Sequence, residues 1–163
     1  MRLAVTTIFA CAAVVLSAQA PAPPQKLFAS GADVAAMMAK AKNERKPDQP
    51  NFIQPIIVDG AYRANLEYRV HGIDTNPNNH EQQDELVYVV EGAGKLTTGG
   101  KLRDEKRINP TNLTGSSLEG GTSRLIAKGD YIMILANTPH AFTDVEGTLV
   151  IMSLHIPAAN ATK

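Results

Sequence analysis

The segment from Asn78 to Val89 contains residue types that bind a metal ion through nitrogen and oxygen. Asn78 and His80 are two residues apart, so their side chains share one face of an extended strand. Glu85 shares its face with Val87 and Val89 in the apolar run that follows. A carboxylate buried beside two valines needs a cation or hydrogen-bond donors, because burying it unpaired is costly. The pattern indicates a buried polar site.

A second candidate ligand, His140, opens another segment of alternating residues. It shares a face with Phe142 and Asp144, which places an aromatic ring beside the imidazole. The only cysteine, Cys11, lies in the apolar N-terminal run, and removal of that run leaves no thiolate. Any metal is therefore expected to be held by nitrogen and oxygen.

The elements that must position these residues are short strands. From residue 52 onward the hydrophobicity alternates with a period of two, broken by Gly, Asn and Pro. The predicted strands are residues 52–58, 64–70, 85–91, 94–99, 122–127, 131–135, 140–144 and 148–156. About eight short strands with tight turns favour an antiparallel barrel or jelly roll. The polar segment 99–121 between them favours a solvated loop, with a lid over a pocket as the alternative.

The N-terminal residues differ from the rest of the chain. Residues 1–20 have a positive start and an apolar run that ends in small residues, which is typical of a secretory signal peptide. Residues 21–51 predict a proline-rich arm and a helix, capped by Ser30 or Asp33 and packed outside the main fold. Residues 52–157 are expected to form the barrel domain and 158–163 a tail. The expected location is periplasmic or secreted.

The composition is that of one globular domain. The chain has 163 residues, 44% of them apolar and 20% charged, and a formal net charge of zero. Because there is no basic field, we expect no nucleic-acid partner and no membrane partner beyond the signal peptide. No nucleophile-elbow pattern occurs, so serine–histidine hydrolysis is not indicated.

Two motifs resemble those of the cupin superfamily. In the first, Gly72 is followed by five residues and Asn78, by one more residue and His80, by four and Glu85, and by six and Gly92. Every spacing fits the family pattern. Asparagine stands at Asn78, where the family has the first of two histidines.

The second motif keeps the family spacing with three changes of residue. Gly129 is followed by five residues and Leu135, by one more and Asn137, by two and His140, and by three and Asp144. Leu135, Asn137 and Asp144 replace the family's Pro, Gly and Asn. Asn137 can adopt the positive φ that glycine would supply. The chain thus resembles a small single-domain cupin, which implies an all-β fold, a double-stranded β-helix or jelly-roll barrel, here with a short N-terminal helix.

The resemblance implies a metal site inside the barrel. His80, Glu85 and His140 would meet there, and two imidazoles with one carboxylate suit Fe, Mn, Ni or Zn. Asn78 is expected to be a weak or water-mediated fourth ligand. The residues expected to line the pocket are Val87, Val89 and Phe142.

The other polar residues of the strands are predicted to lie on the surface. His71 alternates with Glu67 and Arg69, which indicates an exposed polar face, with binding of a polar substrate at the barrel mouth as the alternative. His155 shares a face with Ser153 and lies opposite the more apolar side of its strand. It is predicted to be a surface or interface residue.

Two functions remain open at this point. The first is an exported metalloenzyme that acts on a small organic molecule by dioxygenase-type or isomerase-type chemistry, as the resemblance implies. The second is a non-catalytic periplasmic module that binds or senses a small ligand without a metal. Small cupins often pair, so a homodimer is the expected assembly. The sequence identifies no separate general acid or base.

Overall fold

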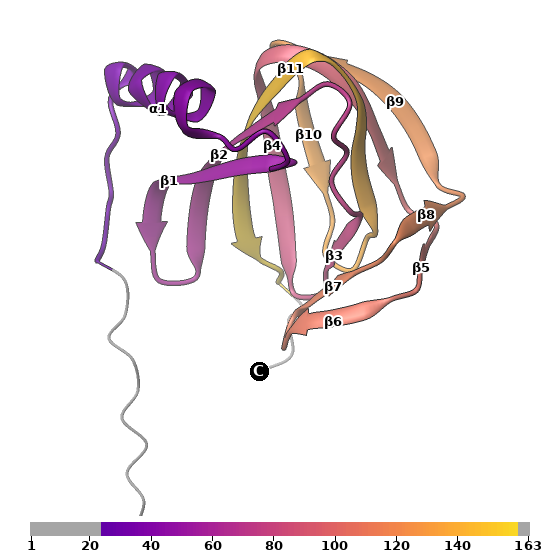
Figure 1. Cartoon of the computed structure of the whole chain (residues 1–163). Helices are drawn as coiled ribbons and strands as arrows, with labels where there is room; N and C mark the ends of the chain where they lie inside the picture. The colour runs from indigo at the N-terminus through magenta and orange to yellow at the C-terminus, as the bar shows by residue number, and fades with distance from the viewer. Residues whose placement is uncertain (1–23, 160–163) are drawn as a thin grey trace, which may run out of the picture.

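The structure is a computed structural model that describes residues 24–159, so the predicted signal peptide and the last residues of the tail lie outside the described part. Figure 1 shows one helix beside a curled sheet. The elements are α1 (Gly31–Glu44), β1 (Asn51–Asp59), β2 (Tyr62–Val70), β3 (Asn78–His80), β4 (Gln83–Thr98), β5 (Lys101–Arg103), β6 (Lys106–Asn109), β7 (Asn112–Thr114), β8 (Ser117–Glu119), β9 (Thr122–Ala127), β10 (Tyr131–Ile134) and β11 (His140–Pro157).

The helix begins and packs as its sequence predicts. Ser30 is the N-cap and forms a capping box with Asp33, which satisfies backbone N–H groups of the first turn. Ala41 is fully buried, and Met37 and Met38 pack with it against the outer face of β2 and β11. In the described residues no helix has the length and hydropathy to cross a membrane.

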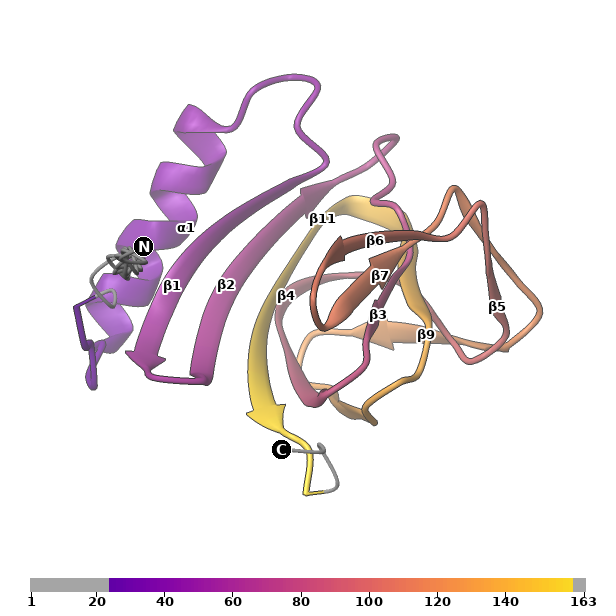
Figure 2. The ribbon, with the colours of Figure 1, turned by 90° about the horizontal axis from the view of Figure 1, so that it is seen from below.

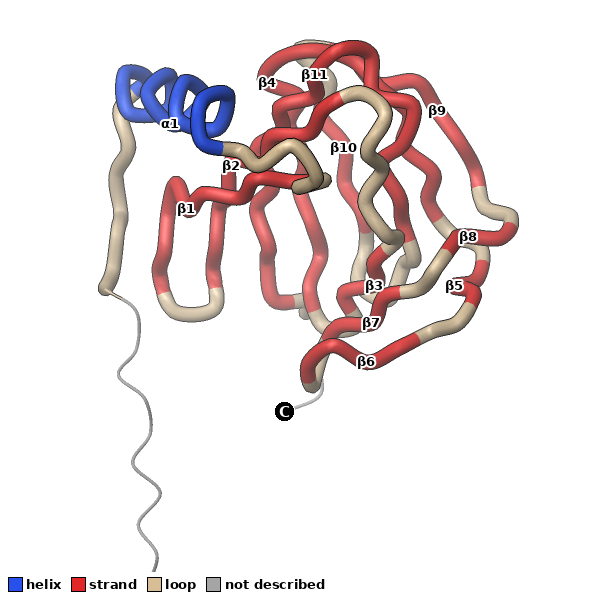
Figure 3. Tube along the Cα trace, viewed as in Figure 1, coloured by secondary structure: helices blue, strands red, loops and turns tan. Residues whose placement is uncertain are grey.

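The strands form an antiparallel sheet that curls around one interior. Within the main sheet β1 pairs with β2, β2 with β11, and β11 with both β3 and β4, while β9 and β10 pair with β4. Figure 2 shows these strands side by side around the interior, with α1 on the outside. Figure 3 shows strands along most of the chain. The prediction of an all-β fold with one N-terminal helix is confirmed.

Two pairs of predicted strands are in fact single long strands. The strands predicted at residues 85–91 and 94–99 both fall in β4, which ends at Thr98, and those at 140–144 and 148–156 belong to β11. Gly92 lets β4 continue, because its φ is +83° and a Cβ there would collide with the carbonyl oxygen of Thr148. In β11 the register shifts between Thr143 and Leu149, where Asp144 has a φ of +49° and pairs with Lys95. Asp144 is exposed and does not share the buried face of His140, which corrects that expectation.

Apolar side chains fill the interior of the barrel. Val87 and Val89 of β4 are fully buried, and Phe142 of β11 packs in the same cluster. Glu85 continues the inward face that Val87 and Val89 define, as the alternation predicts. The candidate site is therefore built at one end of an apolar core.

The face of β2 that carries Glu67 and Arg69 points inward. Both side chains are buried, with exposed fractions of 7% and 6%, so the prediction of an exposed polar face is wrong. The opposite face, with Leu66 and Tyr68, is apolar and covered by α1. Both faces of β2 are therefore buried, and on the more polar one Glu67 and Arg69 form an ion pair with each other. His71 is exposed, as predicted.

The segment 99–121 is not a structureless loop. It contains β5, β6, β7 and β8, of which β7 pairs with β3 and β6 with β7, while β5 and β8 form a separate two-stranded sheet. Arg107 of β6 forms an ion pair with Glu81, the residue that directly follows β3. The segment therefore reaches the strand that carries His80.

Candidate metal centre

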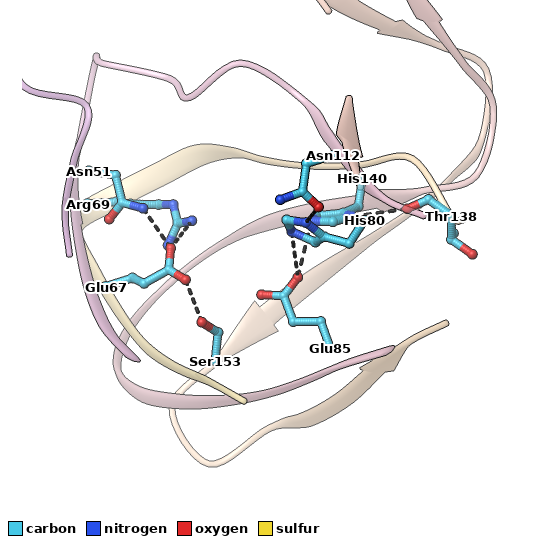
Figure 4. Close-up of polar contacts among 9 residues, drawn as sticks. All are labelled: Asn51, Glu67, Arg69, His80, Glu85, Asn112, Thr138, His140 and Ser153. Carbon is cyan, nitrogen blue, oxygen red and sulfur yellow. Dashed lines mark hydrogen bonds and ion pairs between the residues drawn. The ribbon is translucent and has the colours of Figure 1, made fainter. Parts of the chain in front are cut away.

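Three of the predicted ligands converge in the structure (Figure 4). Glu85 Oε2 lies 3.2 Å from His140 Nε2 and 3.7 Å from His80 Nε2. The three residues come from β4, β11 and β3, which the sheet brings together although they are distant in sequence. Glu85 and His140 are buried, while 17% of the His80 side chain is exposed. The geometry agrees with the predicted set, and its role as a ligand set stays a prediction.

A fourth side chain, His155, joins the cluster against expectation. It was predicted to be a surface or interface residue, but it is half-buried and its ring stands perpendicular to that of His80 at a centroid distance of 4.8 Å. Potential ligand atoms of His80, Glu85 and His155 all lie within 4.8 Å of one another. His155 pairs directly with Glu85 across β11 and β4, so both side chains point to the same interior.

The Nδ1 atoms of two histidines are already engaged. His140 Nδ1 donates to the carbonyl oxygen of Thr138 at 3.0 Å, and His80 Nδ1 lies 2.9 Å from Asn112 Oδ1, which accepts its proton. In the neutral form of both rings, the proton on Nδ1 leaves the lone pair on Nε2, the atom that a metal ion would bind. Asn112 lies in β7, so the polar segment 99–121 supplies the group that orients His80. Sequence reasoning missed Asn112 because its contact depends on the pairing of β3 with β7.

Replacing Asn112 with alanine should therefore weaken metal binding without unfolding the protein. The His80 ring would lose the acceptor that selects its tautomer, and we expect an increase in the metal dissociation constant of about tenfold or more. Competition titration with a chromophoric chelator measures this change. Asn43→Ala on the exposed side of α1 is the control, and equal affinities of the two variants would show that the contact with Asn112 does not orient a ligand.

The charges in the cluster are strongly coupled. Burial raises the pKa of Glu85, but the neighbouring imidazoles of His140, His155 and His80 lower it more, so this pKa is well below its usual range. Burial lowers the pKa of His140, but its contact with Glu85 outweighs burial and the pKa is raised. Burial dominates at His80 and lowers its pKa despite the contact with Asn112. The Glu85 carboxylate and the neutral His80 imidazole are in the protonation states that a metal requires, whereas His140 would release its proton on metal binding.

The donor set fits a metal ion bound by nitrogen and oxygen. Among the described residues Glu85 Oε2 and His155 Nδ1 are buried side-chain atoms without a hydrogen-bond partner. Such atoms are costly unless something outside the chain binds them. Ligand atoms about 2.1 Å from one ion lie about 3.0–3.5 Å from each other, and the separations around Glu85 Oε2 are close to that range.

The remaining predicted residues surround this cluster. Asn78 is half-buried and pairs in register with His140, on the same face of β3 as His80, so its role as a weak or water-mediated ligand stays a prediction. Asn137 has the predicted positive φ, +58°, and its N–H donates to the carbonyl oxygen of His80. Phe142 lies beside His140 at a centroid distance of 6.2 Å. Val87 and Val89 follow Glu85 on the inward face of β4 and belong to the apolar core next to it.

Comparison with known proteins identifies the fold. No protein-family model matches this chain, and no curated protein matches it in sequence. Similar solved structures include BH2720 from Bacillus halodurans, with a TM-score of 0.53, 16% identity and coverage of 83% of this chain and 84% of that one. KdgF from Halomonas sp. has a TM-score of 0.51, 18% identity and coverage of 72% and 86%. These neighbours share the jelly-roll barrel of the cupins. This chain has the cupin fold.

The cupin resemblance expected from the two motifs is thereby confirmed at the level of fold. A further similar structure is the iron(II) form of HppE, with a TM-score of 0.51 and 14% identity, over 66% of this chain and 52% of that one. The matched region thus spans about half of the HppE chain. At such identities the likeness establishes the fold alone, so the chemistry must be argued from the site.

Proposed function

We propose that this cupin binds one divalent transition-metal ion between His80, Glu85, His140 and His155, and that it acts there on a small organic molecule. The observation that carries the proposal is the buried Glu85 Oε2, which faces two Nε2 atoms and accepts no hydrogen bond from the described residues. Three imidazoles and one carboxylate form a complete nitrogen and oxygen donor set for Fe, Mn, Ni or Zn. In this arrangement His155 supplies the imidazole that Asn78 cannot.

The residues of the chain position and shield the reacting molecule. When bound, a metal in such a site polarises a substrate oxygen or binds dioxygen beside it. His80 is the most exposed of the predicted triad, so substrate approaches from its side. The apolar cluster that contains Val87 and Phe142 excludes water from the opposite side. Dioxygenase-type or isomerase-type chemistry is the proposed class, and the iron(II) form of HppE, a structure of similar fold, supports Fe(II) as the first metal to test.

Metal analysis of purified protein tests the proposal. Protein prepared without a metal-affinity tag, stripped with chelator and then given Fe(II), Mn(II), Ni(II) or Zn(II), is expected to retain about one equivalent of ion, measured by inductively coupled plasma mass spectrometry. His155→Ala should retain much less, because one of four ligands is lost. His71→Ala is the matched control, since His71 is exposed and outside the cluster.

Each outcome of this experiment has a defined consequence. Wild-type protein that retains none of the four ions contradicts the metal site. Equal retention by wild type and His155→Ala removes His155 from the ligand set and leaves the three residues predicted from sequence.

The alternative is a ligand-binding cupin without a metal. One observation favours it. The pKa of His140 is raised beside Glu85, so a protonated His140 and the ionised Glu85 form an internal charge pair, which can balance the buried carboxylate without a metal. A protein without metal affinity that still binds a small organic molecule would select this function.

We also propose that the protein forms a homodimer through the outer face of β9 and β10. Tyr131, Met133 and Leu135 alternate with the buried residues of β10 and are exposed, as is Leu125 of β9. A row of large exposed apolar side chains is typical of an interface. Sedimentation velocity should show a dimer, and Met133→Glu should raise its dissociation constant about a hundredfold, because a buried unpaired charge costs several kcal/mol. Ile53→Glu, exposed on β1, is the control, and a monomeric wild type contradicts the proposal.

Export is part of the proposal and rests on the sequence alone. Residues 1–20 carry the apolar run and small terminal residues of a signal peptide. The proposed location is the periplasm or the outside of the cell.

A further inference from the structure

A second polar cluster lies inside the barrel, beside the metal centre (Figure 4). It consists of Asn51 of β1, Glu67 and Arg69 of β2, and Ser153 of β11. Glu67, Arg69 and Ser153 are buried, and Asn51 is half-buried. Polar groups in such a position are expected to have partners for all their hydrogen-bonding atoms.

Glu67 has its partners within the chain. Its Oε2 accepts hydrogen bonds from Asn51 Nδ2 at 2.6 Å and Arg69 Nη2 at 2.7 Å, and its Oε1 accepts one from Ser153 Oγ at 2.5 Å. These three donors satisfy both oxygens of the carboxylate. Glu67 therefore needs no further ligand.

Arg69 and Asn51, in contrast, keep unused atoms at the same place. Arg69 Nε and Nη1 and Asn51 Oδ1 are buried and have no partner among the residues the structure describes. Because Asn51 must present its amide nitrogen to the Glu67 carboxylate, its oxygen is left as a free acceptor. A buried polar group without a partner destabilises the fold unless a ligand supplies one. Two donor nitrogens of the charged guanidinium and one acceptor oxygen thus lie in the same cluster, and no described residue forms a hydrogen bond with them.

This cluster adjoins the metal centre through one aromatic ring. The Arg69 guanidinium lies over the ring of Phe142, with Cζ 4.6 Å from its centroid, and His140 packs against the same ring. Along the inward face of β2, burial increases from the exposed Arg63 through the half-buried Asn65 to Glu67 and Arg69. Arg63 pairs in register with His155. A molecule that enters at His155 therefore meets the metal centre first and the Arg69 guanidinium deeper in the barrel.

We infer that Arg69 and Asn51 form an anion subsite that binds the carboxylate of a small hydroxy acid, with the metal centre at its other end. The free guanidinium N–H groups donate to carboxylate oxygens, which is the strongest pairing open to them. Asn51 Oδ1 accepts from a hydroxyl group beside that carboxylate. The inference rests on the proposed function and sharpens it, because it names the substrate class of the same site.

Nuclear magnetic resonance of the metal-free protein tests the subsite directly. The probe is lactate, which has a carboxylate and an adjacent hydroxyl, and lactamide and propionate are the comparison probes. Lactate should shift the Arg69 Nε–Hε cross-peak saturably. Propionate should bind several-fold more weakly, and neutral lactamide should leave the peak unmoved.

Variants separate binding from structure. Glu67→Gln leaves the guanidinium without its internal carboxylate, so lactate should raise the thermal midpoint of this variant more than that of wild type. The double variant Glu67→Gln with Arg69→Met lacks both charges and should show no lactate binding. Arg124→Gln, exposed on β9, should behave as wild type.

The result that overturns the inference is an Arg69 Nε–Hε peak that lactate and propionate leave unmoved in folded wild-type protein. Because these titrations use metal-free protein, they are independent of metal uptake. Lactate binding without metal binding contradicts the proposed metalloenzyme alone, and metal binding without any carboxylate response contradicts the anion subsite alone.

Discussion

Replacing Glu85 with glutamine is expected to raise the metal dissociation constant about a hundredfold or more, the largest effect of any single substitution in the centre. Glu85 is the only anionic group of the cluster, and its Oε2 faces both His140 Nε2 and His80 Nε2. Glutamine has nearly the same shape, so a loss of affinity reports the loss of charge rather than a collapsed site. Calorimetric titration of the chelator-stripped protein measures the constant.

The matched control for this substitution lies on the same strand. Glu91→Gln changes an exposed carboxylate of β4 and should leave metal affinity unchanged. If Glu85→Gln binds the ion as tightly as Glu91→Gln, the carboxylate is not a ligand and the proposed centre is wrong.

The charges of Glu85 and His140 predict how the stability of the metal-free protein depends on pH. The lowered pKa of Glu85 contributes stability that is complete above the unfolded value of 4.5 and is lost as pH falls through the folded value. The raised pKa of His140 contributes stability that is complete below the unfolded value of 6.5 and is lost as pH rises through the folded value. Their contribution is therefore greatest between pH 4.5 and 6.5. In Glu85→Gln, burial is left to dominate and the pKa of His140 should fall below its usual value.

Replacing Arg69 with methionine should destabilise the protein by about 3–5 kcal/mol, because it leaves a carboxylate buried without its cation. Glu67 would keep only its contacts with Asn51 and Ser153. Urea unfolding in the absence of metal and organic acids measures the free energy of unfolding. A substitution at the exposed Arg63 of the same strand should change it by less than about 0.5 kcal/mol.

A double variant separates the loss of charge balance from the loss of packing. Glu67→Gln with Arg69→Met removes both charges, and it should recover most of the stability lost in Arg69→Met. If the double variant is as unstable as the single one, the cost comes from the contact between Arg69 and Phe142 rather than from the unpaired carboxylate.

The sequence predicts that the three side chains of the triad lie close together, because strand alternation and counted spacings both act over short distances. His80 and Glu85 are separated by one turn, and His140 opens a strand whose preceding turn needs the positive φ of Asn137. Each can be placed from its neighbours in the chain. The fold class follows for the same reason, since the strand pattern and the turns that separate the strands are local.

His155 and Arg69 could not be placed this way. Alternation indicates which residues share a face, but it does not indicate which face points inward. On β2 and β11 the outer face is apolar and packs in the cluster beneath α1, so an apolar face does not mark the barrel interior on these strands. Asn112 was missed for another reason: it reaches His80 through a strand pairing inside a segment whose composition resembles a loop.

The course of β11 has a consequence for how much folded protein a cell contains. His140 is the first residue of this strand and His155 lies near its end, beyond the register shifts that bend it. An ion held by both residues would act as a cross-link within the strand that pairs with β2, β3 and β4. Metal binding and folding then share one equilibrium, and free metal at about 100 times the dissociation constant adds about 2.7 kcal/mol of stability. The abundance of this protein would accordingly follow the metal supply of its compartment, because chains that lack the ion unfold and are degraded sooner.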